Sequence, residues 1–165
     1  MLNDSYVEQA LKAKPGNDFY VKLAISIWVI FMGIPVLFFI GGIGIILSII
    51  GICLFVHFLG YRNMEYEYTL TNGSIEIAAI YNASKRKELM HFDMEQVTMV
   101  TPEDSDRISH EPVVKRHNFT SGNKDRRGIA LIVEINGKKE LVLMEPSAKS
   151  LEHIKGFAKN KIYDI

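Results

Sequence analysis

The sequence predicts an α+β membrane protein in which an apolar helical hairpin precedes a small antiparallel β domain. Two observations carry this prediction. Residues 23–59 form a run of 37 residues without a charged side chain. From Met64 onward, apolar and polar residues alternate with the period of two that marks half-buried strands. Nineteen basic and nineteen acidic residues cancel, so the overall charge gives no indication of a nucleic-acid partner.

The apolar run is long enough to cross a bilayer twice. A single helix of this length would extend about 55 Å, whereas the hydrocarbon core is about 30 Å thick. Two spans near residues 22–40 and 43–61 fit this thickness, and Gly41, Gly42 and Gly44 mark the reversal between them. A cleaved signal peptide is disfavoured because its apolar region would be only about 7–15 residues long.

Small residues in both predicted spans allow the two helices to approach closely. These candidate helix-packing residues are Gly33 in the first span and Gly44, Ser48 and Gly51 in the second. The same residues would suit a homo-oligomer equally well, so they do not fix the number of chains.

Cations flank the hairpin only on the side of the chain termini. Lys12, Lys14 and Lys22 precede it and Arg62 follows it, whereas the turn between the spans has no cation. The positive-inside rule then predicts a cell-membrane protein with two spans and both termini in the cytoplasm.

Three segments are expected along the chain. Residues 1–18 form an N-terminal tail, with a short helix that Asp4 or Ser5 caps and that ends before Pro15. Residues 19–62 form the transmembrane hairpin, and residues 63–165 form a cytoplasmic β domain.

The first β hairpin of this domain is predicted from its turn and from its pattern together. Asn72-Gly73 is typical of a type I′ turn, which needs positive φ at both positions. Counting outward from this turn pairs Leu70 with Ile75 and Tyr68 with Ile77, so the apolar faces of the two strands coincide. Further strands are expected near residues 87–92, 96–101, 116–120, 129–135 and 139–144.

The register of the last strand pair stays open. A two-residue turn at Asn136-Gly137 sets Val133 opposite Glu140, whereas a longer loop or a bulge would align Val133 with Leu141. Beyond this pair, residues 147–159 predict an amphipathic helix with a stripe of apolar side chains and a cap at Ser147.

Seven strands in meander order followed by one helix match a PH-like roll, in which two bent sheets have one open end covered by the helix. A five- or six-stranded barrel is the alternative.

The sequence also contains the short motifs Asn3-Asp4-Ser5-Tyr6-Val7-Glu8, Glu65-Tyr66-Glu67-Tyr68, Asn72-Gly73, Ile75-Glu76-Ile77, Ser84-Lys85-Arg86-Lys87, Phe92-Asp93 and Glu145-Pro146. Together these motifs resemble an uncharacterised family of small clostridial-type bacterial membrane proteins, which is known as a domain of unknown function. The resemblance implies this architecture and a bacterial source, and it implies no catalytic residue.

The cluster Lys85-Arg86-Lys87 is the candidate lipid contact. The strand after the second span carries the Asn72-Gly73 turn about 20 Å away, at about 3.3 Å per residue, and the next strand returns. These three cations are therefore expected near the membrane surface, where anionic headgroups attract each of them by about 1 kcal/mol. An ordinary solvated hairpin tip is the alternative.

Catalytic and metal-binding signatures are missing from the sequence. Cys53 is the only cysteine, the five histidines have no metal-ligand spacing, and no phosphate or dinucleotide loop occurs. We therefore expect no cofactor, no metal site and no enzymatic activity. The function predicted is a membrane-anchored interaction module that binds a membrane-protein partner or lipid headgroups. The alternatives are an accessory subunit of a transport or envelope complex and, less favoured, a small membrane hydrolase that uses His91, Asp93 and the long charged loop of residues 102–128.

Overall fold

The computed structural model describes residues 5–123 and 125–165, and it divides the chain into two compact units. A helical unit comprises Lys14–Met64 with Tyr81–Lys85. A β unit combines the N-terminal segment up to Ala13 with Glu65–Ile80 and Arg86–Ile165. The fold class is α+β, as the sequence predicts.

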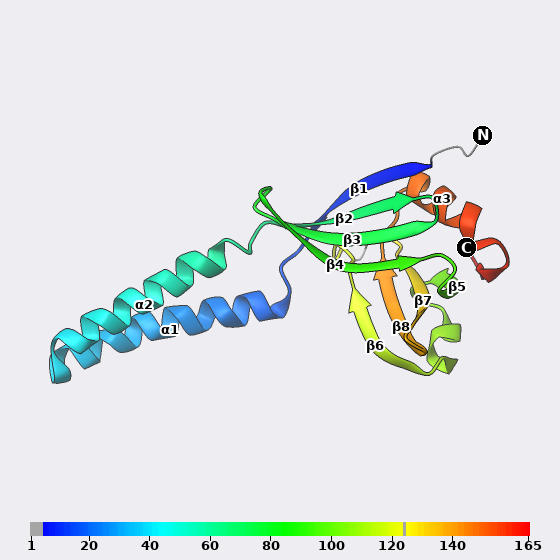
Figure 1. Ribbon diagram of the computed structural model, residues 1–165. Coiled ribbons are helices and arrows are strands. Elements are labelled where there is room, and N and C mark those ends of the chain that lie inside the picture. Colours follow the sequence, from blue (N-terminus) through cyan, green and yellow to red (C-terminus); the bar gives the residue numbers. More distant parts are fainter. Residues whose placement is uncertain (1–4, 124) are drawn as a thin grey trace. The chain divides into compact units, whose positions relative to one another are not determined.

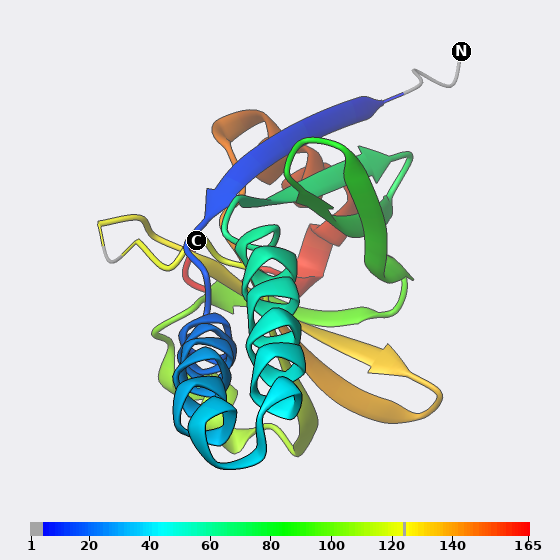
Figure 2. The ribbon, with the colours of Figure 1, turned by 90° about the vertical axis from the view of Figure 1, so that its left-hand side faces the viewer.

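The helical unit is an antiparallel pair of helices, α1 (Asn17–Ile40) and α2 (Gly42–Leu59), joined at Gly41. Figure 1 and Figure 2 both show the two helices side by side along their length. Both are long and apolar enough to cross a membrane. Most of their large apolar side chains are exposed, Phe38 and Phe39 among them. In water such a surface would be strongly unfavourable, which is why it suits lipid.

Small residues lie where α1 and α2 touch. Gly33, Gly44 and Gly51 are buried, and a Cβ atom added at Gly44 would overlap the backbone of Leu37. The hydroxyl of Ser48 donates a hydrogen bond to the carbonyl of Gly44 at 3.1 Å. The two helices approach so closely at these three glycines that a larger residue has no room there.

The N-terminal segment is a strand, β1 (Tyr6–Ala13), so the predicted short helix is wrong. The amide of Asn72 donates to the carbonyl of Ser5 at 3.1 Å, which places the start of β1 beside the end of β2 (Met64–Thr71). Every second residue of β1 turns inward, and Leu11 is buried. Pairing with a neighbouring strand thus outweighs the local helix propensity on which the prediction relied.

The first sheet has the strand order β1-β2-β3-β4, with β3 at Ser74–Tyr81 and β4 at Lys85–Asp93. Asn72 and Gly73 have φ values of 48° and 85°, as a type I′ turn requires. The predicted inward residues of the first hairpin, Tyr68 and Leu70 on β2 and Ile75 and Ile77 on β3, are all buried.

The second sheet has the order β5-β7-β8-β6. Its strands are β5 (Val97–Pro102), β6 (Val113–Asn118), β7 (Ile129–Ile135) and β8 (Lys138–Met144). Because β6 pairs with β8 in parallel, the predicted meander of antiparallel strands is wrong at this point. The chain crosses back to β7 after Phe119. The ring of Phe119 is buried, and its backbone amide donates a hydrogen bond to the carbonyl of Leu143, so both hold the crossing in place.

The register of β7 and β8 is that of the two-residue turn, with Val133 opposite Glu140 and Leu131 opposite Val142. Both faces of this pair are apolar. One face joins the main core through Leu131 and Val142, and the other forms a smaller cluster through Ile132 and Leu141. Alternation therefore could not decide the register, since either face accepts apolar residues.

Helix α3 (Ala148–Ala158) covers one end of the β unit. Ser147 caps it, as predicted, by accepting a hydrogen bond from the amide of Ser150 at 3.2 Å. Gln9 of β1 is also attached to this helix start. Its side-chain Oε1 accepts from the backbone amide of Ser147 at 2.6 Å and from the hydroxyl of Ser150 at 2.8 Å. Its side-chain Nε2 donates to the backbone carbonyl of Glu145 at 2.8 Å.

Replacing Gly44 by alanine tests the helix contact. We expect Gly44→Ala to destabilise the hairpin by about 1–3 kcal/mol, because overpacking forces the backbones apart. Gly42→Ala is the matched control, since a Cβ atom at Gly42 meets nothing within 4 Å. Thermal unfolding of both variants in detergent checks this expectation, and equal melting temperatures would contradict it.

Candidate functional site

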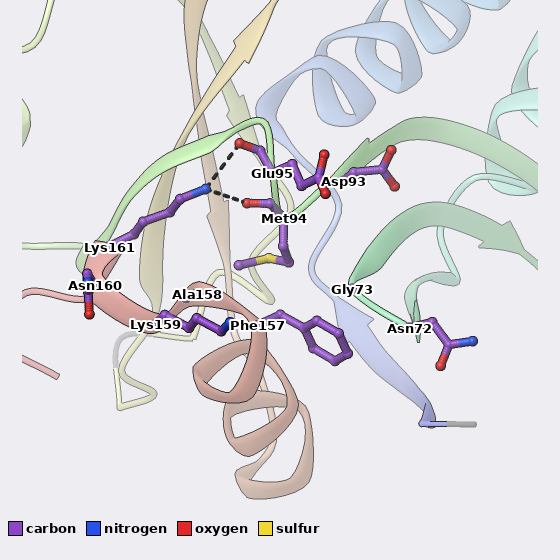
Figure 3. Close-up of a pocket in the computed structure, with 10 residues that line it drawn as sticks. All are labelled: Asn72, Gly73, Asp93, Met94, Glu95, Phe157, Ala158, Lys159, Asn160 and Lys161. Carbon is purple, nitrogen blue, oxygen red and sulfur yellow. Dashed lines mark hydrogen bonds between the residues drawn. The ribbon is translucent and has the colours of Figure 1, made fainter. Parts of the chain in front are cut away.

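A cavity of about 650 Å³ lies in the β unit beside the C-terminal end of α3. Two turns, Asn72-Gly73 and residues 93–95, form one side, and residues 157–161 form the other (Figure 3). Its volume falls within the range of roughly 300–1,000 Å³ that ligand pockets occupy. It is the candidate binding site of the β unit.

Apolar groups form the wall and the floor of this cavity. The ring of Phe157 projects toward the Asn72-Gly73 turn (Figure 3), and a Cβ atom at Gly73 would lie 2.8 Å from that ring. Met94 is buried beneath, at 3% exposure, and its amide donates to the carbonyl of Gly73 at 2.8 Å. The two turns are thereby held together as one surface.

Charged groups surround this apolar floor. The ammonium of Lys161 donates to the carbonyls of Met94 and Glu95 at 2.9 and 3.1 Å, which ties the chain after α3 to the second turn. Asp93, Glu95 and Lys159 are exposed at the rim, and no ion pair within the described part of the chain uses them. An apolar floor with charges of both signs around it suits a peptide segment better than a uniformly charged ligand.

A buried histidine supports the Phe157 wall from below. The rings of His153 and Phe157 lie 4.9 Å apart, and Nδ1 of His153 is hydrogen-bonded to the hydroxyl of Ser5 at 2.7 Å. Burial lowers the pKa of His153, so the imidazole is kept neutral at pH 7. Through Ser5 the cavity wall is connected to strand β1.

The predicted cation cluster does not act as a set of three free cations. The guanidinium of Arg86 forms ion pairs of 2.7 Å with Glu67 and with Glu76, and these two carboxylates raise the pKa of Arg86 further above its already high value. Lys85 and Lys87 are exposed and take part in no ion pair among residues 5–123 and 125–165. Two lysines are thus left for an external anion.

The histidines of the β unit that lie on strands remain separate. Nε2 of His91 is hydrogen-bonded to the hydroxyl of Ser74 at 2.7 Å, and Nε2 of His117 is hydrogen-bonded to Glu140 at 2.7 Å. Across the residues that the structure describes, no three histidine, cysteine or acidic side chains gather as metal ligands would.

The described part of the polar segment of residues 102–128 is only partly solvated, as residues 106–113 show. Ile108 lies in a short 3₁₀ helix (Asp106–His110), and together with Val113 it packs on the outer apolar cluster of β7 and β8. The segment therefore has a structural task, which is to cover a second apolar face of the sheet.

Sequence reasoning did not find the cavity beside α3. Its residues come from three places far apart in the chain, and each looks ordinary in its own segment. One signal was available in the sequence, because Phe157 lies beside the apolar stripe of α3 and does not belong to it. The structure shows that this side chain is 40% exposed.

The comparisons with known proteins agree with this architecture. The chain matches the family described as bacterial PH-like domain (DUF6106) over residues 3–164. No curated protein and no solved structure matches it. The match covers nearly the whole chain, hairpin included, so the chain belongs to the bacterial PH-like domain family DUF6106.

Proposed function

We propose that this protein is a membrane-anchored interaction module without catalytic activity. The hairpin crosses the bilayer twice, both termini face the cytoplasm, and the β domain binds a partner protein at the cytoplasmic leaflet. One observation carries the proposal: two exposed apolar helices are inserted between β1 and β2, which are neighbours in one sheet.

This insertion gives the β domain two covalent tethers. Because β1 and β2 run antiparallel, the chain leaves the sheet and returns to it at the same end. Both connections, residues 14–16 and 60–63, are short. A domain with two short tethers has less freedom than one on a single linker, and less entropy is lost when it binds a partner at the membrane.

The cavity beside α3 supports binding of a protein segment. It combines an apolar wall at Phe157 with free charges of both signs at Asp93, Glu95 and Lys159. PH-like domains serve mostly as non-catalytic interaction modules, which is an argument from the fold alone.

The packing of the hairpin favours this module over an accessory subunit of a larger complex. A subunit would need small-residue faces that stay open for other membrane helices. Gly33, Gly44 and Gly51 instead lie buried between α1 and α2, so the hairpin uses them for its own packing.

Cysteine labelling tests the anchor and its orientation. In a Cys53→Ser background, we expect Ser84→Cys to react with a membrane-impermeant maleimide only in inverted vesicles, and Gly42→Cys only in intact spheroplasts. The physical reason is that the hairpin turn and the β3–β4 turn then face opposite compartments. Labelling of both positions from one side, or recovery of the chain without detergent, would disprove the proposed topology.

Photo-crosslinking in living cells tests the binding cavity. A photoreactive residue at Asn160, inside the cavity, should give a discrete adduct with one partner protein. The adduct should become about tenfold weaker in Phe157→Ala, because losing a buried aromatic anchor costs 1–2 kcal/mol or more. The same photoreactive residue at Lys149, an exposed site on α3 outside the cavity, is the matched control. An adduct of equal strength from both sites would count against the cavity.

We also propose that Lys85 and Lys87 help the β domain to dock on anionic lipid. Their exposure and the absence of ion pairs to them within the described residues support this role, whereas Arg86 is held by its two carboxylates. Replacing both lysines by glutamine should remove about 2 kcal/mol of attraction at an anionic surface, at about 1 kcal/mol each. A fluorophore on the β domain should then rotate more freely in phosphatidylglycerol nanodiscs.

The double variant Lys115→Gln, Lys149→Gln is the matched control, since it removes the same charge at two other exposed positions. Fluorescence anisotropy of both variants in phosphatidylglycerol and in phosphatidylcholine nanodiscs makes the comparison. Unchanged anisotropy after loss of Lys85 and Lys87 would remove this part of the proposal.

A further inference from the structure

A second cavity, of about 450 Å³, lies within the helical unit where α1 begins and α2 ends. Residues at the start of α1 and at the end of α2 line it together with Tyr81, which belongs to the same unit. The charge-free run of the sequence begins one residue after Lys22 and ends at Tyr61, immediately before Arg62. The cavity therefore lies at the boundary of the apolar surface.

Aromatic rings form much of the wall. The rings of His57 and Tyr61 lie 5.5 Å apart, and those of Tyr61 and Tyr81 lie 5.1 Å apart, both in edge contact. Phe19 and Phe58 add apolar area. Tyrosine is enriched where a membrane meets water, because its ring is apolar and its hydroxyl is polar.

The polar groups that line this cavity are unused inside the chain. Among the residues that the structure describes, Lys22 and Asp18 form no ion pair, and the hydroxyls of Tyr61 and Tyr81 make no hydrogen bond. Asp18 and Lys22 are four residues apart, so they share one face of α1. One cation, one carboxylate and two hydroxyls thus line an otherwise apolar hollow.

We propose that this cavity binds one phospholipid whose headgroup carries both a phosphate and an ammonium group. Lys22 and the tyrosine hydroxyls bind the phosphate, and Asp18 binds the ammonium. The apolar wall accepts the start of the acyl chains, which continue along the exposed surface of α1 and α2. This inference rests on the proposed membrane anchor, and it adds a defined lipid site to it.

Charge complementarity selects this occupant. A headgroup with a phosphate alone would meet the carboxylate of Asp18 as well as the ammonium of Lys22, and the two contributions would oppose each other. A zwitterionic headgroup satisfies both groups at once. We therefore expect phosphatidylethanolamine to bind more tightly than phosphatidylglycerol.

Native mass spectrometry of the full-length chain in detergent, titrated with each of the two lipids, tests this site. We expect saturable binding of one phosphatidylethanolamine molecule. Lys22→Gln should weaken it about tenfold, the size expected for one charge-assisted hydrogen bond. Asp18→Asn should lower the preference for phosphatidylethanolamine over phosphatidylglycerol.

Two matched controls separate the site from general effects of charge and of aromatic rings. Arg62→Gln removes a cation near the same helix ends but outside the cavity, and it should leave binding unchanged. Tyr81→Phe should weaken binding by removing one hydroxyl, whereas Tyr20→Phe, also outside the cavity, should not.

Equal loss of lipid in Lys22→Gln and Arg62→Gln, or lipid binding without saturation, would overturn the inference. The proposed anchor is tested separately. Absence of the wild-type chain from the membrane fraction would disprove it. Recovery in the membrane without a stoichiometric lipid would overturn the lipid site alone.

Discussion

The pairing of β1 with β2 is the constraint on which the rest of the molecule depends. These two strands are neighbours in the sheet but lie on either side of the helical hairpin in the chain. The β unit can be completed only when the segment before the hairpin returns to the strand after it. Because the hairpin brings its two ends back together, it closes what would otherwise be a long and entropically costly loop.

The contacts of β1 show what this pairing contributes. Leu11 enters the main core, Gln9 binds the start of α3 through three hydrogen bonds, and Ser5 contacts both the Asn72 turn and His153. The N-terminal strand thus joins the sheet, the helix and the wall of the candidate cavity. An edge strand with so many partners protects β2 from pairing with other chains.

Local sequence patterns predicted those elements that are determined by residues within one segment of the chain. The apolar run and its glycines indicated two helices and the position of the turn, and Asn72-Gly73 indicated the first β hairpin. Ser147 indicated the start of α3 for the same reason, since an N-cap side chain acts on backbone amides two or three positions away. The role of β1 could not be found in this way, because Leu11 and Gln9 obtain their partners from residues far along the chain.

The candidate sites illustrate the same division between local and distant information. The sequence places Lys85, Arg86 and Lys87 together, but only the fold shows that Glu67 and Glu76 neutralise the central cation. Likewise, nothing in residues 18–22 indicates a site until Tyr61 and Tyr81 are brought opposite them. A charged group becomes a candidate for binding when folding leaves it without an internal partner, and that property belongs to the tertiary structure.

This distinction also assigns different roles to the two proposed lipid contacts. Lys85 and Lys87 are exposed on a strand, so they would feel only the average charge of a lipid surface and would respond strongly to salt. Lys22 and Asp18 are exposed too, but they lie one helical turn apart and line the same hollow as Tyr61 and Tyr81, so their opposite charges have fixed positions. Recognition of one lipid headgroup requires the arrangement at Lys22 and Asp18, because opposite charges at fixed positions discriminate between headgroups. A diffuse positive surface would attract the same headgroups only in proportion to their net charge.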